Sequence, residues 1–207
     1  MYTLLLATNN PHKIEEIKEI FSHYQNNNFR VISLFDAEKE LNIKLSEPVE
    51  DGLTFKDNAY IKAKYYKDYF EDYFVASDDT GLMVDALGGL PGVHSKRFSE
   101  PNPTNEKNRK KLLNELANIK DNKDRSAHFE TCVCLIDLEN KVHYFYGKVF
   151  GYIMDHEEGE LGFGYDPLFF SSELNKPFSC CDNFEKNKVS HRGRAFRGLI
   201  EYLSENY

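Results

Sequence analysis

The segment FVASDDTGLMVDALGGLPGVHSKRF, residues 74–98, combines an apolar strand, two adjacent carboxylates and a glycine-rich loop. Residues 74–76 are apolar and predict a buried strand. Asp78 and Asp79 follow at its end, where carboxylates need a cation, hydrogen-bond donors or water to stay ionised. A divalent cation such as Mg²⁺ suits them, whereas the following Thr-Gly pair is typical of a solvated turn. Both interpretations stay open here, and the glycines favour the first, because they let a backbone approach a ligand closely.

The first residues predict a strand that leads directly into a helix. Residues 3–8, TLLLAT, are apolar, and Asn10-Pro11 is a good helix start, because asparagine caps and proline fits the first turn. The helix is expected over 11–24, with Lys13 in its first turn. A lysine at this end of a helix is consistent with an anion-binding site, or with a capped helix whose lysine faces solvent. The Walker A pattern G-x-x-x-x-G-K-[ST] is absent.

The order of elements predicts an α/β fold with a mixed sheet and flanking helices, whose long central strands could bridge two lobes around a cleft. Asn58 and Lys62 lie four residues apart on one helix face, which could point into a cleft or into water. Arg109 is expected on the solvated face of its helix. The further elements expected are strands at 30–35, 127–137, 141–153 and 168–170, and helices at 54–69, at 104–119 and after residues 190–193.

Length and charge limit the possible classes of protein. A chain of 207 residues is expected to form a single domain, 1–207, with two lobes. Its net charge of −8 argues against a nucleic-acid-binding protein, which would carry a basic stripe. The sequence contains no apolar run of about 18 residues, so no membrane span is expected. The start, MYTLLLATNN, is short and lacks basic residues, and it is interpreted as a strand rather than a signal peptide.

Five segments resemble the inosine/xanthosine triphosphate pyrophosphatase family, and they occur in the family's order over nearly the whole chain. The segments are LATNNPHKIEEI (6–17), EDGLTFKDNAYIKA (50–63), ASDDTGLMVDALGGLPGVHSKRF (76–98), GFGYDPLFF (162–170) and SHRGRAF (190–196). The resemblance implies an enzyme that hydrolyses the non-canonical purine nucleotides ITP, dITP and XTP to the monophosphate and pyrophosphate. It further implies an elongated α/β fold with a central mixed sheet and a substrate cleft between two lobes. Mg²⁺ as cofactor, a homodimer, and a house-cleaning role in the cytoplasm are implied as well.

The resemblance also implies roles for individual residues. Asp79 resembles the general base and, together with Glu50, the Mg²⁺ ligands. Thr80 stands where the family usually has serine. The residues that resemble the triphosphate-binding motif are Thr8, Asn9, Asn10 and Lys13. Those that resemble the nucleotide and base pocket are Phe163, Gly164, Tyr165, Asp166, Lys186, His191 and Arg192, and the hydroxyl of Thr80 could serve as a further substrate contact. Two departures from the family pattern, Lys96 and Phe98, could alter the cleft or the dimer contact.

Two other functions are compatible with some of these residues. Asp-Asp-Thr resembles the Asp-x-Asp-x-Thr motif of aspartyl-phosphate phosphatases, but adjacent strand residues point to opposite faces, so the spacing is wrong. A nucleotide sensor that binds without turnover would need the same pocket. All the expected polar residues are present, so the sequence gives no support to a loss of turnover. Pyrophosphate release distinguishes the preferred enzyme from both.

Overall fold

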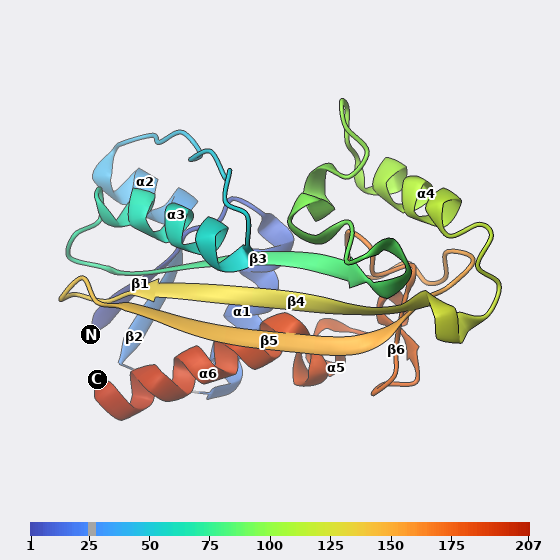
Figure 1. The fold of residues 1–207 in the computed structure, drawn as a ribbon. Helices are drawn as coiled ribbons and strands as arrows, with labels where there is room; N and C mark the ends of the chain where they lie inside the picture. The colour runs from blue at the N-terminus through green and yellow to red at the C-terminus, as the bar shows by residue number, and fades with distance from the viewer. Residues whose placement is uncertain (25–27) are drawn as a thin grey trace. The chain divides into compact units, whose positions relative to one another are not determined.

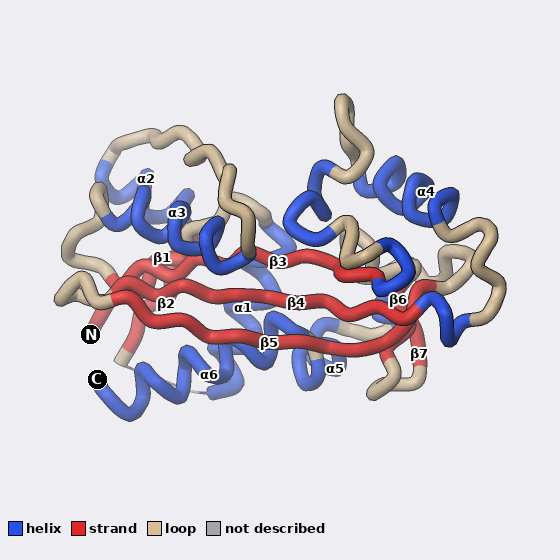
Figure 2. Tube along the Cα trace, in the orientation of Figure 1, coloured by secondary structure: helices blue, strands red, loops and turns tan. Residues whose placement is uncertain are grey.

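The computed structural model describes residues 1–24 and 28–207. Figure 1 shows the elements in chain order, and Figure 2 distinguishes helices from strands. The strands are β1 (Tyr2–Leu6), β2 (Phe29–Ser33), β3 (Phe74–Val84), β4 (Ser126–Ile136), β5 (Val142–Ile153), β6 (Phe169–Ser171) and β7 (Lys176–Pro177). The α-helices are α1 (Pro11–Tyr24), α2 (Leu34–Leu41), α3 (Phe55–Lys67), α4 (Asn105–Glu115), α5 (Asn183–Val189) and α6 (His191–Asn206). In the described part of the chain, no helix is long and apolar enough to cross a membrane.

The strands form one seven-stranded sheet in the order β2-β1-β3-β4-β5-β6-β7. β1 runs parallel to both of its neighbours, with Leu4 opposite Val31 on β2 and Phe74 on β3. β6 runs antiparallel to β5 and to β7. The sheet is therefore mixed and flanked by helices, which confirms the predicted fold class.

The chain divides into two compact units. The first contains residues 1–79, 131–146 and 195–207, and the second contains residues 80–130 and 147–194. Both ends of the chain belong to the first unit (Figure 1). The rings of Tyr2 and Tyr207 pack edge to face there, with centroids 5.7 Å apart.

In the first unit, alternation along β3 decides the surroundings of each aspartate. Phe74 and Ala76 pack into a core with apolar side chains of α1 and α6. Ser77 points to the other face, where its hydroxyl donates to the carbonyl of Ala59 on α3. Because strand side chains alternate, Asp78 lies on the face of α1 and α6, whereas Asp79 lies on the face of α3.

The second unit has an aromatic core of its own. The ring of Phe169 lies 4.8 Å from that of Phe129 and 5.0 Å from that of Phe178, measured between centroids. Leu82 and Val84, from the second half of β3, are completely buried in the same cluster. This burial stabilises β3 beyond the two aspartates.

The structure corrects several local predictions. The turn expected at Thr80-Gly81 is wrong, because β3 continues to Val84 and buries its apolar side chains there. The strand expected over 30–35 ends at Ser33, whose hydroxyl accepts from the N–H of Asp36 in a capping box that opens α2. Helix α4 ends at Glu115, earlier than predicted. Helices α2 and α5 were not expected at all.

Candidate active site

The turn between β1 and α1 is held by its own side chains. Thr8 Oγ1 accepts a hydrogen bond from the N–H of Asn10 at 3.3 Å. Asn10 Oδ1 accepts from the N–H groups of His12 at 3.0 Å and Lys13 at 3.4 Å. Asn9, between them, is exposed. Asparagine therefore caps α1 as the sequence predicts, and the turn has a defined conformation before any ligand binds.

Lys13 forms an ion pair with Asp78. Its Nζ lies 2.9 Å from Asp78 Oδ2, and the two side chains are 16% and 1% exposed. The interpretation of Lys13 as a solvent-facing lysine is therefore wrong. A carboxylate this deeply buried requires a charged or hydrogen-bonding partner, and α1 supplies it from its first turn.

Asp79, on the opposite face of β3, contacts α3 instead. Its Oδ2 accepts a hydrogen bond from Asn58 Nδ2 at 3.1 Å. Asn58 is 3% exposed, and its Oδ1 accepts from the backbone N–H of Gly52 at 2.8 Å. The two adjacent aspartates thus have different direct partners, Lys13 for Asp78 and Asn58 for Asp79.

Glu50 lies in the loop before α3 and pairs with that helix. Lys62 Nζ lies 2.7 Å from Glu50 Oε2, and the two side chains are 11% and 36% exposed. Because Lys62 is four residues after Asn58, the helix face that carries both is directed toward carboxylates and not toward water. The question that the sequence left open for this face is thereby answered.

The charges of this first-unit cluster influence one another. Burial raises the pKa of Asp79 above its ordinary value, and the cations of Lys62 and Lys13 only partly oppose this effect. Burial lowers the pKa of Lys62, but the carboxylates of Glu50, Asp79 and Asp78 outweigh it, so that the pKa is raised overall. The ionised form of Asp79 is thus disfavoured, and an added cation would stabilise it.

The donor set fits Mg²⁺ better than a soft metal. Across residues 1–24 and 28–207, no three His, Cys, Asp or Glu side chains are grouped so that they could hold a metal by themselves. Mg²⁺ does not require such a group, because it commonly binds one or two carboxylates together with waters and substrate phosphates. Glu50 and Asp79 offer two carboxylates of this kind in the first unit.

The second unit contains a buried lysine–carboxylate pair at the turn over 163–166. Lys186 Nζ lies 2.7 Å from Asp166 Oδ2, with side chains 2% and 4% exposed. The same oxygen accepts from the N–H of Phe163 at 2.9 Å. Gly164 has a φ of +62° and Gly162 one of +76°, and a Cβ on Gly162 would lie 2.3 Å from Asp166 Oδ2. The turn therefore depends on glycine and on the carboxylate of Asp166.

Two cations face the ring of Phe163 in this second-unit cluster. Lys186 Nζ lies 5.1 Å from the ring centroid and Arg192 Cζ lies 5.7 Å from it. Arg192 is 1% exposed, and its Nη2 lies 3.4 Å from Thr80 Oγ1. His191 stacks on Phe129 at 4.8 Å. The cluster brings an aromatic ring, buried cations and a hydroxyl together, which suits an aromatic ligand with polar edges.

Helix α4 contributes a residue that was expected in solvent. Arg109 Nη1 donates to the carbonyl of Gly164 at 3.0 Å, and its Nε lies 2.9 Å from Glu157 Oε1. Its side chain is 16% exposed, so the prediction of a solvated Arg109 is wrong. The side chain of Tyr165 is also fixed in position, because its hydroxyl donates to the carbonyl of Ser95 at 2.9 Å. Burial raises the pKa of this hydroxyl, so it stays protonated.

The predicted site residues thus form two groups, one in each unit. Thr8, Asn10 and Lys13 lie at one turn, and Asp79 and Glu50 are linked to α3. The remaining residues, Thr80, Phe163–Asp166, Lys186, His191 and Arg192, belong to the second unit. The sequence singled out Asp78 and the helix face of Asn58 and Lys62, but it assigned them no role and did not predict their partners, which the structure shows to be Lys13, Asp79 and Glu50.

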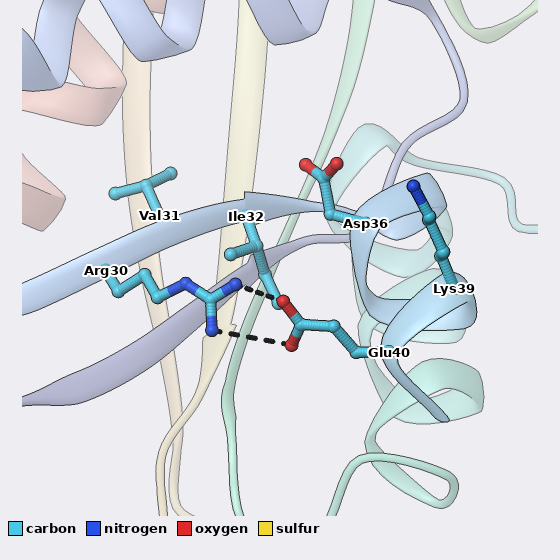
Figure 3. A pocket seen from close by; sticks show the side chains of 6 residues that line it. All are labelled: Arg30, Val31, Ile32, Asp36, Lys39 and Glu40. Atoms are coloured by element: carbon cyan, nitrogen blue, oxygen red, sulfur yellow. Dashed lines mark hydrogen bonds and ion pairs between the residues drawn. The ribbon is translucent and has the colours of Figure 1, made fainter. Parts of the chain in front are cut away.

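An open pocket elsewhere in the first unit has none of this chemistry. It lies between β2 and α2 and is lined by Arg30, Val31, Ile32, Asp36, Lys39 and Glu40 (Figure 3). Arg30 and Glu40 form a bidentate ion pair in this pocket. Arg30 is paired with Glu40 and Asp36 lies near Lys18, and none of the residues predicted for the site lines this pocket.

The class of protein indicated by the fold and the site is an α/β enzyme. Its first-unit cluster of lysines and carboxylates suits anions and a metal, and its second-unit cluster of cations around Phe163 suits an aromatic base. The chain belongs to the Ham1 family, whose model matches residues 4–202. It is 44% identical over 204 residues to a dITP/XTP pyrophosphatase of Caldanaerobacter subterraneus subsp. tengcongensis, which covers 98% of this chain and 96% of that protein. It is 38% identical to a dITP/XTP pyrophosphatase of Clostridium perfringens, with 98% of both chains covered.

Solved structures agree with this assignment. The Staphylococcus aureus Ham1 protein superposes with a TM-score of 0.83 at 33% identity, covering 99% of this chain and 100% of that one. A HAM1 protein from Coxiella burnetii superposes with a TM-score of 0.85 at 31% identity, with the same coverage. The resemblance identified in the sequence is therefore confirmed, and so is the mixed sheet with flanking helices.

Proposed function

We propose that this protein hydrolyses dITP, ITP and XTP to the corresponding monophosphate and pyrophosphate, and so removes non-canonical purines from the nucleotide pool. Membership of the Ham1 family makes it an enzyme of the nucleoside triphosphate pyrophosphatase class. The single observation that carries the proposal is the first-unit cluster, in which Asp79, Glu50 and Lys62 join α3 to β3 and the preceding loop. Buried carboxylates beside lysines are the groups that phosphoryl chemistry requires.

The polyphosphate is assigned to the first unit. Lys13 is partly exposed beside the capped turn of Thr8–Asn10, so its ammonium can bind a phosphate oxygen and still neutralise Asp78. Lys62 likewise has a charge that can be shared between Glu50 and a bound anion. Two lysines at fixed positions would offset the negative charge of a triphosphate and of the pyrophosphate that leaves.

Asp79 is assigned as the general base. Its carboxylate is held by the amide of Asn58 on the α3 face of β3, where it can accept a proton from a water molecule. Glu50 and Asp79 would hold Mg²⁺, which supplies charge neutralisation on the phosphates and orients the attacking water. The proton of that water passes to the Asp79 carboxylate as the new oxygen–phosphorus bond forms and pyrophosphate departs.

The base is assigned to the second unit. The purines of ITP and XTP carry a 6-oxo acceptor, whereas adenine carries a 6-amino donor at that position. Donors such as Arg192 and His191 would hydrogen-bond to the oxo group but would have no acceptor opposite an amino group, and the aromatic ring of Phe163 lies beside Arg192. An unmet buried hydrogen bond costs about 1–3 kcal/mol, so two mismatches give roughly 10²–10⁴-fold discrimination against ATP.

A product assay tests the proposal. With Mg²⁺ present, ITP, dITP, XTP, GTP and ATP are supplied in turn, and pyrophosphate and orthophosphate are measured separately. Pyrophosphate from ITP, dITP and XTP, with little from ATP and GTP, is expected. Orthophosphate alone would indicate a phosphatase, and tight nucleotide binding without turnover would indicate a sensor.

The assembly and location of the protein are further parts of the proposal. By its resemblance to the pyrophosphatase family, we expect a homodimer, which light scattering coupled to size-exclusion chromatography would detect as a mass twice that of the 24.1 kDa chain. We place the enzyme in the cytoplasm, because its proposed substrates are free nucleotides. Fractionation of cells that express the protein would test this location.

A further inference from the structure

We propose that Asn58 is a positioning residue that holds Asp79 and the Glu50 loop in one arrangement for the metal. This inference rests on the proposed function. The side-chain amide of Asn58 makes two hydrogen bonds. Its Nδ2 donates to Asp79 Oδ2 at 3.1 Å, and its Oδ1 accepts from the N–H of Gly52 at 2.8 Å. Gly52 is two residues after Glu50, so one side chain connects the segments that carry both expected metal ligands.

The helix start makes this amide rigid. The N–H of Asn58 donates to the carbonyl of Thr54 at 3.1 Å, as expected for the first complete turn of α3. Thr54 in turn forms a capping box with Asp57. Because helical side chains point back toward the N-terminus of the helix, Asn58 is directed at the loop that precedes α3. The side chain is 3% exposed, so its two hydrogen bonds have little competition from water.

Gly52, in the loop before α3, allows this close contact with Asn58. A Cβ on Gly52 would lie 2.7 Å from Asn58 Oδ1, 2.7 Å from the Cβ of Asp57 and 3.0 Å from the backbone nitrogen of Asn58. Real Cβ atoms do not approach backbone and Cβ atoms so closely, so only glycine allows the loop to reach the amide. The glycine and the asparagine therefore form one feature, built for close approach of the Glu50 loop to α3.

An asparagine suits this task better than a charged residue. Its donor favours the ionised form of Asp79, and its acceptor satisfies a backbone N–H, without adding a charge that would compete with the metal or repel the phosphates. Side chains that orient metal ligands commonly matter 10–100-fold for metal affinity, although they never touch the metal. Asn58 is placed to act on both expected ligands together.

The test measures metal binding directly. Mn²⁺, as a paramagnetic substitute for Mg²⁺, is titrated into the intact protein alone and with pyrophosphate, and free Mn²⁺ is followed by electron paramagnetic resonance. Asn58→Ala is expected to weaken Mn²⁺ binding about 10–100-fold and to lower kcat for dITP by a similar factor, with KM changed less than about threefold at saturating metal. If Asn58→Ala does not fold, Asn58→Ser, whose hydroxyl is too short to connect both partners, gives the same readout.

A double-mutant cycle and a matched control separate positioning from stability. Gly52→Ala should weaken Mn²⁺ binding as well, and the double variant should lose less than the product of the two single effects, because both disrupt one contact. Asn108 is an equally buried asparagine of the second unit, 2% exposed, whose amide accepts from the N–H of Ser99 and donates to the carbonyl of Lys96. Asn108→Ala should lower the stability and leave Mn²⁺ affinity unchanged.

Two results would overturn the inference. One is unchanged Mn²⁺ affinity in Asn58→Ala, whatever happens to its stability. The other is no Mn²⁺ binding by the wild type, with or without pyrophosphate. The proposed function fails on a different measurement, namely the absence of pyrophosphate from dITP and XTP with wild-type protein, so the two failures are distinguishable.

Discussion

The two polar clusters differ in how far their charges are buried. In the first unit, Lys13 and Glu50 keep 16% and 36% of their side chains exposed, and their partners lie on β3 and α3. In the second unit, Lys186 and Asp166 are 2% and 4% exposed. Partly exposed charges can exchange partners when a metal or phosphate arrives, whereas deeply buried pairs cannot do so cheaply. If the proposed roles are correct, we expect the ion pairs of the first cluster to rearrange when substrate binds and the Lys186–Asp166 pair to stay in place.

The largest expected effect concerns chemistry in the first cluster. Asp79→Asn keeps the shape of the side chain but removes the proposed base and a metal ligand, so kcat for dITP should fall about 10²–10⁴-fold. The free energy of unfolding should stay at or above the wild-type value, because a buried carboxylate with a raised pKa is replaced by a neutral amide. Stopped-flow or coupled detection of pyrophosphate measures kcat, and near-normal turnover would rule Asp79 out as base.

The next effect is on stability and belongs to the second cluster. Lys186→Met leaves the buried Asp166 carboxylate without its cation, and the free energy of unfolding should fall by about 3–5 kcal/mol. Lys176→Met is the matched control, because Lys176 pairs with Glu185 at the surface, with side chains 35% and 37% exposed. Its loss should cost less than about 1 kcal/mol. Urea unfolding measures both free energies. Equal losses in the two variants would show that the buried Lys186–Asp166 pair is no more important for stability than the surface Lys176–Glu185 pair.

A smaller effect on activity is expected for Lys13→Ala, although its stability should also fall because the buried Asp78 carboxylate loses its cation. The loss of a phosphate contact should raise KM for triphosphates and lower kcat, each by about tenfold, since one charge-assisted hydrogen bond contributes about 1.5–3 kcal/mol. Lys18→Ala on the same helix serves as control, because Lys18 is 45% exposed and lies 3.6 Å from Asp36. Steady-state kinetics distinguish the two variants. Unchanged KM and kcat in Lys13→Ala would contradict the assignment of the α1 turn to the triphosphate.

The smallest effect lies outside both clusters and depends on pH. Asp137 in the β4–β5 turn accepts from the N–H groups of Glu139 and Lys141 and lies 2.8 Å from His143 Nε2. Burial opposes its ionisation, but these hydrogen bonds prevail and hold its pKa below the ordinary value. A lowered folded-state pKa gives stability that is present above the unfolded pKa of about 3.9 and is lost as the pH falls through the folded value.

Asp137→Asn should therefore lower the free energy of unfolding by about 1 kcal/mol at neutral pH. The difference from wild type should shrink below pH of about 4, where the native carboxylate also becomes protonated. Urea unfolding at neutral and acidic pH measures both values. A difference of the same size at both would show that the charge of Asp137 does not stabilise the turn.

The local elements were largely predictable from sequence. The cap of α1 by Asn10, the helix that follows Thr54 and the strands expected over 127–137 and 141–153 all depend on neighbouring residues, and the structure confirms them. Helix α2 was missed because RVISLF suggests one continuous strand, although Ser33 and Asp36 have the spacing of a capping box. The turn predicted after Asp79 failed because turn preference at Thr80-Gly81 is weaker than the burial of Leu82 and Val84.

The sequence by itself determined the family, the α/β class and the residue types of both clusters, because ordered motifs and hydrophobic periodicity are properties of the chain. Only the tertiary structure decided which partner each charge has. Adjacent aspartates on β3 face opposite sides of the sheet, so Asp78 meets Lys13 on α1 and Asp79 meets Asn58 on α3. Such pairings depend on how α1 and α3 pack against the strand, and contacts between residues far apart in the chain leave no periodic signal in the sequence.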